Sequence, residues 1–274
     1  MTRNTLHQPP TTQNKRTFGE YGPWIAFIAA AALLLGSGTV ALAGAAKDIT
    51  RAGVLIGADD DNMDNPVIQP ADSQIDQSLN NGDVLIGRDG PDVLIGLLGA
   101  DLLEGGEDDD ILIGGPEAFV APNKDIILGG SGNDINIWAP GDGSDAFLGG
   151  PGDRDAMVFG VLDRVDGIPT LTPSPGRLRT GIPTAEVTNM PGFCVLEAAS
   201  RRETGFDYLV RFFTFSDGLL KVTVRLRDVE QLFCNGPDGG TITYADLTQK
   251  NPILEVVSLQ EVVEANPLVG QIIR

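Results

Sequence analysis

Aspartates recur through the middle of the chain at a strict spacing of nine residues. Asp83, Asp92, Asp101 and Asp110 each precede a mainly aliphatic triplet, and glycine follows each triplet. Calcium is a hard cation that takes roughly six to eight oxygen ligands, from carboxylates and from backbone carbonyls. Glycine lacks a Cβ and permits tight turns that direct carbonyls toward such an ion. The pattern therefore predicts a series of cation sites at the glycine-rich turns.

The same spacing indicates the elements that hold these aspartates. Short repeats of one turn and one strand gain a core only by stacking on their neighbours, as in a solenoid. After an insertion at residues 116–124, the pattern resumes at Asp125 and continues through Asp134 and a looser row at Asp145. We expect the middle residue of each triplet to point inward. The resulting core ladder would consist of Leu85, Leu94, Leu103, Leu112, Ile127 and Phe147.

Residues 105–113 and 129–137 best fit the nonapeptide Gly-Gly-x-Gly-x-Asp-x-aliphatic-x. This pattern resembles the repeats-in-toxin, or haemolysin-type, calcium-binding family, and the resemblance covers residues 82–160. It implies a parallel β-roll in which several Ca²⁺ ions are bound. The family's ligand position corresponds to Asp83, Asp92, Asp101, Asp110, Asp125, Asp134 and Asp145. Secondary candidates in the turns are Asp89, Glu107, Asp108, Asn133 and Asp142.

Three rows depart from the family pattern. Asp108 replaces a glycine of its turn, and the row that ends at Asp125 has lost its glycines to the insertion. We therefore expect a weak or absent site at Asp125. The last row carries Asp153 and Asp155 on either side of the expected position, which we interpret as an atypical terminal turn.

The acidic charge is concentrated in one segment. Residues 53–160 hold 22 acidic residues against three basic ones, and the whole chain has a formal net charge of −19. This charge argues against nucleic acid and anionic membrane surfaces as partners, because phosphate binding needs clustered Lys and Arg. The alternative is a solvated acidic face. However, unit charges 4 Å apart repel by about 4 kcal/mol at an effective dielectric of 20. We therefore expect calcium binding and folding to be coupled.

The N-terminal segment, residues 1–45, has the charge order of a secretory signal. The apolar run 24–45 follows Arg3, Lys15 and Arg16 and ends in small residues. An uncleaved membrane anchor is the alternative, and it would be the chain's only contact with a membrane. Either reading places the rest of the chain outside the cytoplasm, secreted or at the cell surface. Residues 46–81 form an acidic linker or a degenerate first turn.

Residues 161–274 have balanced charge and alternating apolar residues, which predicts a small, mostly-β capping region. Residues 206–215 and 219–227 read as the two strands of a β-hairpin. Residues 252–265 predict an amphipathic helix. Cys194 and Cys234 are expected to form a disulfide in an exported protein, against the alternative of two buried thiols. The complete fold class is therefore all-β, a calcium-binding roll with a C-terminal cap.

The sequence gives little indication of an enzyme. The only histidine is His7, in the predicted export segment, so the mature chain lacks a zinc-protease motif and a Ser-His-Asp triad. The leading hypothesis is an exported, non-enzymatic calcium-binding protein with a structural or surface-associated role. The alternative is an extracellular binding or adhesion module that recognises a protein partner or polysaccharide through its C-terminal region.

Overall fold

The structure is a computed structural model that describes residues 45–47, 54–56, 84–115, 124–152, 154–165, 167–172, 181–200, 202–203 and 205–274. The chain divides into two compact units, Met1–Ala41 and Leu42–Arg274, and all of these residues belong to the second. Residues 1–44 of the expected export segment, most of the expected linker and Asp83 lie outside the described residues.

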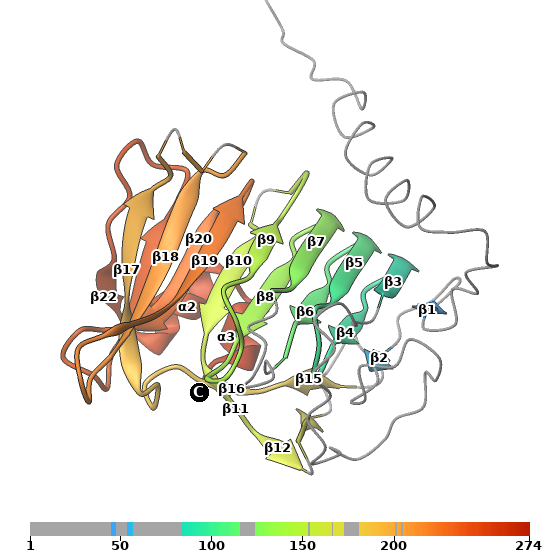
Figure 1. The fold of residues 1–274 in the computed structure, drawn as a ribbon, viewed down its shortest axis with the longest axis horizontal. Coiled ribbons are helices and arrows are strands. Elements are labelled where there is room, and N and C mark those ends of the chain that lie inside the picture. Colours follow the sequence, from blue (N-terminus) through green and yellow to red (C-terminus); the bar gives the residue numbers. More distant parts are fainter. Residues whose placement is uncertain are drawn as a thin grey trace, which may run out of the picture. The chain divides into compact units, whose positions relative to one another are not determined.

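Two eight-stranded sheets, here called sheet 1 and sheet 2, form the body of this unit (Figure 1). In sheet order, sheet 1 contains β1 (Ala45–Lys47), β3 (Val84–Asp89), β5 (Leu102–Glu107), β7 (Ile126–Ser131), β9 (Ala146–Leu148), β19 (Leu220–Arg227), β18 (Tyr208–Thr214) and β17 (Gly192–Ala198). Sheet 2 contains β2 (Val54–Ile56), β4 (Val93–Ile95), β6 (Ile111–Ile113), β8 (Ile135–Trp138), β10 (Ala156–Phe159), β20 (Gln231–Asn235), β21 (Ile242–Asp246) and β22 (Glu255–Val257).

The repeat strands form the predicted all-β, parallel β-roll. Consecutive repeats supply strands to opposite sheets, so one coil of the roll needs two nine-residue repeats. Val84 therefore pairs in parallel with Leu102 in sheet 1, and Val93 with Ile111 in sheet 2. The short strand Val54–Ile56 pairs with β4 in the same way, so it also belongs to the roll.

A hydrophobic core fills the space between the two sheets. The predicted ladder is confirmed, because its six side chains are at most 1% exposed and belong to one cluster, namely Leu85, Leu94, Leu103, Leu112, Ile127 and Phe147. Asn136 is a polar exception in β8. It aligns with Leu112 and Met157 on the neighbouring strands, and its Nδ2 has no hydrogen-bond partner among the described residues.

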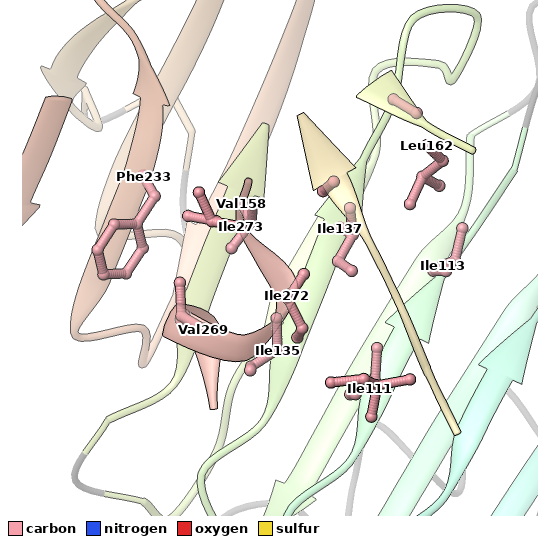
Figure 2. Close-up of a cluster of buried hydrophobic side chains, with 14 of the residues drawn as sticks. Ile111, Ile113, Ile135, Ile137, Val158, Leu162, Phe233, Val269, Ile272 and Ile273 are labelled. Carbon is pink, nitrogen blue, oxygen red and sulfur yellow. The ribbon is translucent and has the colours of Figure 1, made fainter. Parts of the chain in front are cut away.

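A second hydrophobic cluster covers the outer face of sheet 2, which the sequence did not lead us to expect. Ile111, Ile113, Ile135 and Ile137 flank the inward residues of β6 and β8, and all four are fully buried. Figure 2 shows these side chains together with those of the C-terminal helix α3 (Val269–Ile272). The outer face of sheet 1 is more open, since Ile126 is 39% exposed.

Three two-stranded sheets connect the roll to the C-terminal strands. They pair β11 (Val161–Leu162) with β16 (Ala185–Glu186), β12 (Arg164–Val165) with β13 (Ile168–Pro169), and β14 (Leu171–Thr172) with β15 (Ile182–Pro183).

The C-terminal region extends both sheets of the roll. β19 pairs in parallel with β9, and β20 pairs in parallel with β10. The remaining C-terminal strands are antiparallel, including the expected hairpin of β18 and β19. A disulfide joins Cys194 of β17 to Cys234 of β20 and so connects the two sheets.

The C-terminal helix is shorter than the sequence predicts. Residues Glu255–Val257 pair with β21 as strand β22, and α2 covers only Leu259–Ala265. Ser258 sets this boundary because its side chain accepts from the Glu261 N–H, while Glu261 accepts from the Ser258 N–H. This reciprocal capping box begins the helix well inside the expected range.

Candidate metal centre

The turns of the roll repeat one backbone conformation. The second residue has a positive φ in the turns that begin at Gly87, Gly96, Gly105, Gly114, Gly129 and Gly149, whether it is glycine or not, as in Gly106 (φ +123°) and Arg88 (φ 85°). The turn after β8 differs, since its positive φ falls on Gly141. A Cβ on Gly106 would lie 2.1 Å from the Arg88 carbonyl oxygen of the preceding coil. Glycine is thus required here for close stacking of one turn upon the next.

The first glycine of each turn lies beside both an aspartate and a carbonyl. A Cβ on Gly105 would lie 2.2 Å from Asp110 Oδ2 and 2.5 Å from the carbonyl oxygen of Gly129. The same arrangement recurs one coil later around Gly129, where Asp134 Oδ2 is 2.4 Å from the Cβ position. The fold therefore gathers a carboxylate oxygen and a backbone carbonyl oxygen around one point in successive turns.

The aspartates form two ladders, one at the start of the strands of each sheet. In each ladder the backbone N–H of one aspartate donates to Oδ1 of the aspartate in the next coil. In ladder 2, which precedes the strands of sheet 2, these bonds join Asp92 to Asp110 (2.7 Å), Asp110 to Asp134 (2.9 Å) and Asp134 to Asp155 (2.7 Å). In ladder 1, which precedes the strands of sheet 1, they join Asp101 to Asp125 (2.8 Å) and Asp125 to Asp145 (3.0 Å).

The carboxyl groups of these ladders are buried. Asp110, Asp134 and Asp155 are fully buried, and the Oδ2 atom of each has no hydrogen-bond partner among the described residues. Burial is the main reason that the pKa of Asp110 is raised to about 9. Its hydrogen bond with the Asp92 backbone opposes the rise, and the charges of Asp134, Asp92 and Asp108 contribute to it. Burial likewise raises the pKa of Asp134 to about 7 and that of Asp155 to about 8.

Such groups need either a proton or a cation. A buried carboxylate without a compensating charge is strongly disfavoured, so each ladder is stable when its carboxyls are protonated or when a positive ion lies among them. Oxygen donors from carboxylates and carbonyls suit calcium, whereas zinc and copper sites use nitrogen and sulfur. The donor set therefore fits the calcium ions that the sequence implies.

Side chains alone do not complete a metal site. In the described part of the chain, no group of three or more His, Cys, Asp or Glu side chains is placed to hold a metal ion. Each turn instead offers one buried aspartate beside backbone carbonyls, so most ligands of a bound ion would come from the backbone.

The secondary candidates do not join the ladders. Asp89 and Asp108 are exposed on the turns, and Asp108 has a positive φ of 80°. Asn133 is half-buried and donates from both its backbone N–H and its Nδ2 to Asp109 Oδ1. These side chains face solvent or a neighbouring turn rather than the point shared by the carboxylates and carbonyls.

Asp142 is buried but is held in a separate arrangement. Its Oδ2 accepts from the Ala139 N–H at 2.8 Å, and its Oδ1 lies 3.8 Å from Arg164 Nη2. Burial raises the pKa of Asp142 to about 7, and the Arg164 charge opposes this rise.

Asp155 occupies the ladder position that sequence reasoning left open between two acids. Ala156 pairs with Ile135, so Asp155 aligns with Asp134. The turn before it has one additional residue, which displaces the acid from the nine-residue count. The cation site at Asp125 was expected to be weak or absent, and Asp125 nevertheless keeps its place in ladder 1.

Comparisons of the chain with protein-family models, curated proteins and solved structures gave no match. Among the helices in the described ranges, none is long and apolar enough to cross a membrane.

Proposed function

We propose that this chain is an exported, non-enzymatic calcium-binding protein of the repeats-in-toxin type, whose roll folds around several Ca²⁺ ions. One observation carries the proposal. Asp110 is fully buried between Asp92 and Asp134, and its Oδ2 atom lacks a hydrogen-bond partner within the described residues. A divalent cation beside this atom would neutralise neighbouring carboxylates, and carbonyl oxygens of the stacked turns would coordinate it.

Calcium is preferred to magnesium on chemical grounds. Magnesium demands near-ideal octahedral geometry and gives up its waters reluctantly, whereas calcium accepts irregular sets of backbone and carboxylate oxygens. The turns offer an irregular set of this kind. Ions that bind only the folded roll stabilise it by RT ln(1 + [L]/Kd) for each site, so extracellular calcium would drive folding.

A calcium titration of the full chain, followed by far-UV circular dichroism, tests the proposal. We expect a cooperative gain of β signal with calcium and none with magnesium at the same concentration. Asp110→Asn should weaken calcium binding, while the control Glu255→Gln changes an exposed acid on β22 and should not. A wild-type chain that shows no calcium binding in calorimetry would refute the proposal.

Export and a structural or surface-associated role are further parts of this proposal. They are supported by the basic residues before the apolar run 24–45 and by the acidic composition of the remainder. Cell fractionation with N-terminal sequencing of the recovered protein tests both export and cleavage. Recovery of the full-length chain in the cytoplasm would contradict export.

A pocket favours the second candidate function, an extracellular binding module. Residues of the C-terminal region line a pocket of about 500 Å³, including Phe206, Asp207, Tyr208, Lys250 and Asn251. Aromatic rings beside a few polar groups are common in small-ligand sites. Retention of the full chain on immobilised polysaccharide, lost in Lys250→Ala but kept in the control Lys221→Ala, would support this function.

A further inference from the structure

The turn between β19 and β20 stacks on the roll as though it were the next turn of the repeat. Gly130 N–H donates to the Gly149 carbonyl of the next coil at 2.9 Å, and Gly150 N–H donates in the same way to the Asp228 carbonyl at 3.3 Å. Asp228 therefore takes the position of the first glycine. Its positive φ of 50° departs from the repeat, because the positive φ of the repeat turns falls on the second residue.

Glu230 continues ladder 2 beyond the repeats. Ala156 pairs in parallel with Gln231, so Glu230 aligns with Asp155 just as Asp155 aligns with Asp134. The Asp155 N–H donates to Glu230 Oε2 at 2.9 Å, which reproduces the bond from Asp134 N–H to Asp155 Oδ1 at 2.7 Å. A glutamate from a sequence without repeats thus performs the role of the repeat aspartate.

The oxygen atoms around this junction match those of the preceding turn. A Cβ on Gly149 would lie 2.2 Å from the Asp228 carbonyl oxygen and 2.5 Å from Asp155 Oδ2. The corresponding position on Gly129 lies 2.5 Å from the Gly149 carbonyl oxygen and 2.4 Å from Asp134 Oδ2. Asp155 is fully buried, and its Oδ2 has no hydrogen-bond partner among the described residues.

Electrostatics support the comparison. Burial is the main reason that the pKa of Asp155 is raised to about 8, and the charges of Asp134, Glu230 and Asp228 add to the effect. The junction is therefore as unfavourable for uncompensated negative charge as the turns within the repeats.

Ladder 1 provides an internal comparison, because it ends differently. Arg225 pairs with Ala146, so Val224 is the residue aligned with Asp145. Val224 is apolar and fully buried in the core. The C-terminal region thus continues one ladder with an acid and ends the other with a valine.

We infer that the C-terminal region completes one additional calcium site, in which the carboxylates of Asp155 and Glu230 and the carbonyl of Asp228 are ligands. This inference rests on the proposed calcium binding by the repeats. The site joins the roll to the β19–β20 turn, so occupancy of this site stabilises the attachment of the C-terminal region. The shortened turn supplies fewer carbonyls than a full repeat, and the site is accordingly weaker than those between repeats.

Calcium stoichiometry of the full chain tests the inference. Isothermal titration calorimetry and equilibrium dialysis would compare the wild type with Glu230→Gln, in which the amide oxygen still accepts from the Asp155 N–H. The control Glu197→Gln removes an acid of the same region whose carboxylate pairs with Arg211 at 3.0 Å on the surface. We expect Glu230→Gln to bind one Ca²⁺ fewer per chain and Glu197→Gln to bind the wild-type number.

The outcomes separate this inference from the proposed function. A wild-type chain that binds no calcium overturns both. If the wild type binds calcium and Glu230→Gln binds it with the same stoichiometry and affinity, only the additional site is overturned. Near-UV circular dichroism at saturating calcium checks folding, and if Glu230→Gln does not fold, Glu230→Asp is measured instead. This shorter acid should weaken one site at least tenfold, and unchanged affinity at every site would overturn the inference.

Discussion

Raising the pH in the absence of calcium should unfold the β-roll. Asp110 has a pKa of about 9 in the folded chain against an ordinary value of 3.8, so the folded state binds more protons than the unfolded state between these values. The free energy of unfolding therefore falls as the pH rises from about 4 toward 9. The loss is complete only above the folded pKa, and the full stability is present below the unfolded pKa.

The size of this effect is large relative to the stability of a domain. Between its ordinary pKa and pH 7, Asp110 remains protonated in the folded state over about three pH units, and each unit corresponds to about 1.4 kcal/mol. This one carboxyl therefore lowers the free energy of unfolding at pH 7 by about 4 kcal/mol relative to its value at low pH. The pKa values of Asp134 and Asp155 are also raised, to about 7 and about 8, so these carboxyls act in the same direction. The contribution of Asp110 alone is a large part of the 5–15 kcal/mol by which whole domains are typically stable.

Urea unfolding followed by far-UV circular dichroism would measure this dependence at about pH 4.5, 6 and 7.5, in calcium-free buffer and at saturating calcium. We expect the calcium-free midpoint to fall steadily with pH. Calcium displaces protons from the carboxyls, so its stabilising effect should grow over the same range. Asp110→Asn removes a titrating group and should be more stable than the wild type at pH 7.5 without calcium. A calcium-free midpoint that is constant, or that rises with pH, would refute the reasoning.

Three other variants test the packing. Asn136→Leu should raise the free energy of unfolding by about 1–2 kcal/mol in urea titrations, because Nδ2 is buried without a partner in the described structure; a less stable variant would contradict this. Removing the disulfide by Cys194→Ser with Cys234→Ser should lower the free energy of unfolding by about 4 kcal/mol, given a separation of 40 residues. Equal thermal midpoints with and without the bond would count against it. Gly129→Ala should cost about 2–3 kcal/mol in calcium, since the new Cβ would meet Asp134 Oδ2 at 2.4 Å. Wild-type stability of this variant would show that the turns are looser than described.

The nine-residue period was sufficient to predict the roll, its inner core and most of both ladders. This success has a physical basis, because each repeat carries its own turn, ladder aspartate and inward residue. Leu94 and Asp92, for example, can be placed from their own repeat alone. Features that depend on pairing between distant segments could not be predicted from a single repeat.

Glu230 is the clearest example of a residue whose position could not be predicted from the sequence. Its neighbours do not repeat, and its place in ladder 2 follows only from the parallel pairing of β10 with β20. The cover on sheet 2 was also missed. The triplet of β6, Ile111–Ile113, is entirely apolar, but so are residues 126–128 of β7 in the more open sheet 1, where Ile126 is 39% exposed. The apolar triplets alone therefore do not indicate which outer face is covered.

The alternation of strands between two sheets also restricts how the chain can grow or shrink. Asp92 and Asp110 are 18 residues apart, and the insertion at 116–124 increases the corresponding separation to 24 in both ladders. Because both sheets shift together, later strands keep their sides. Duplicating one whole coil would preserve this parity, whereas duplicating a single repeat would exchange the sheets for every strand that follows. The C-terminal helices follow too, so the strands before the duplication would lose their matching cover. A strand suited to solvent, such as β7 with its exposed Ile126, would lie beneath the helices if the duplicated repeat came after it. We therefore expect length variants of this protein to differ by pairs of repeats.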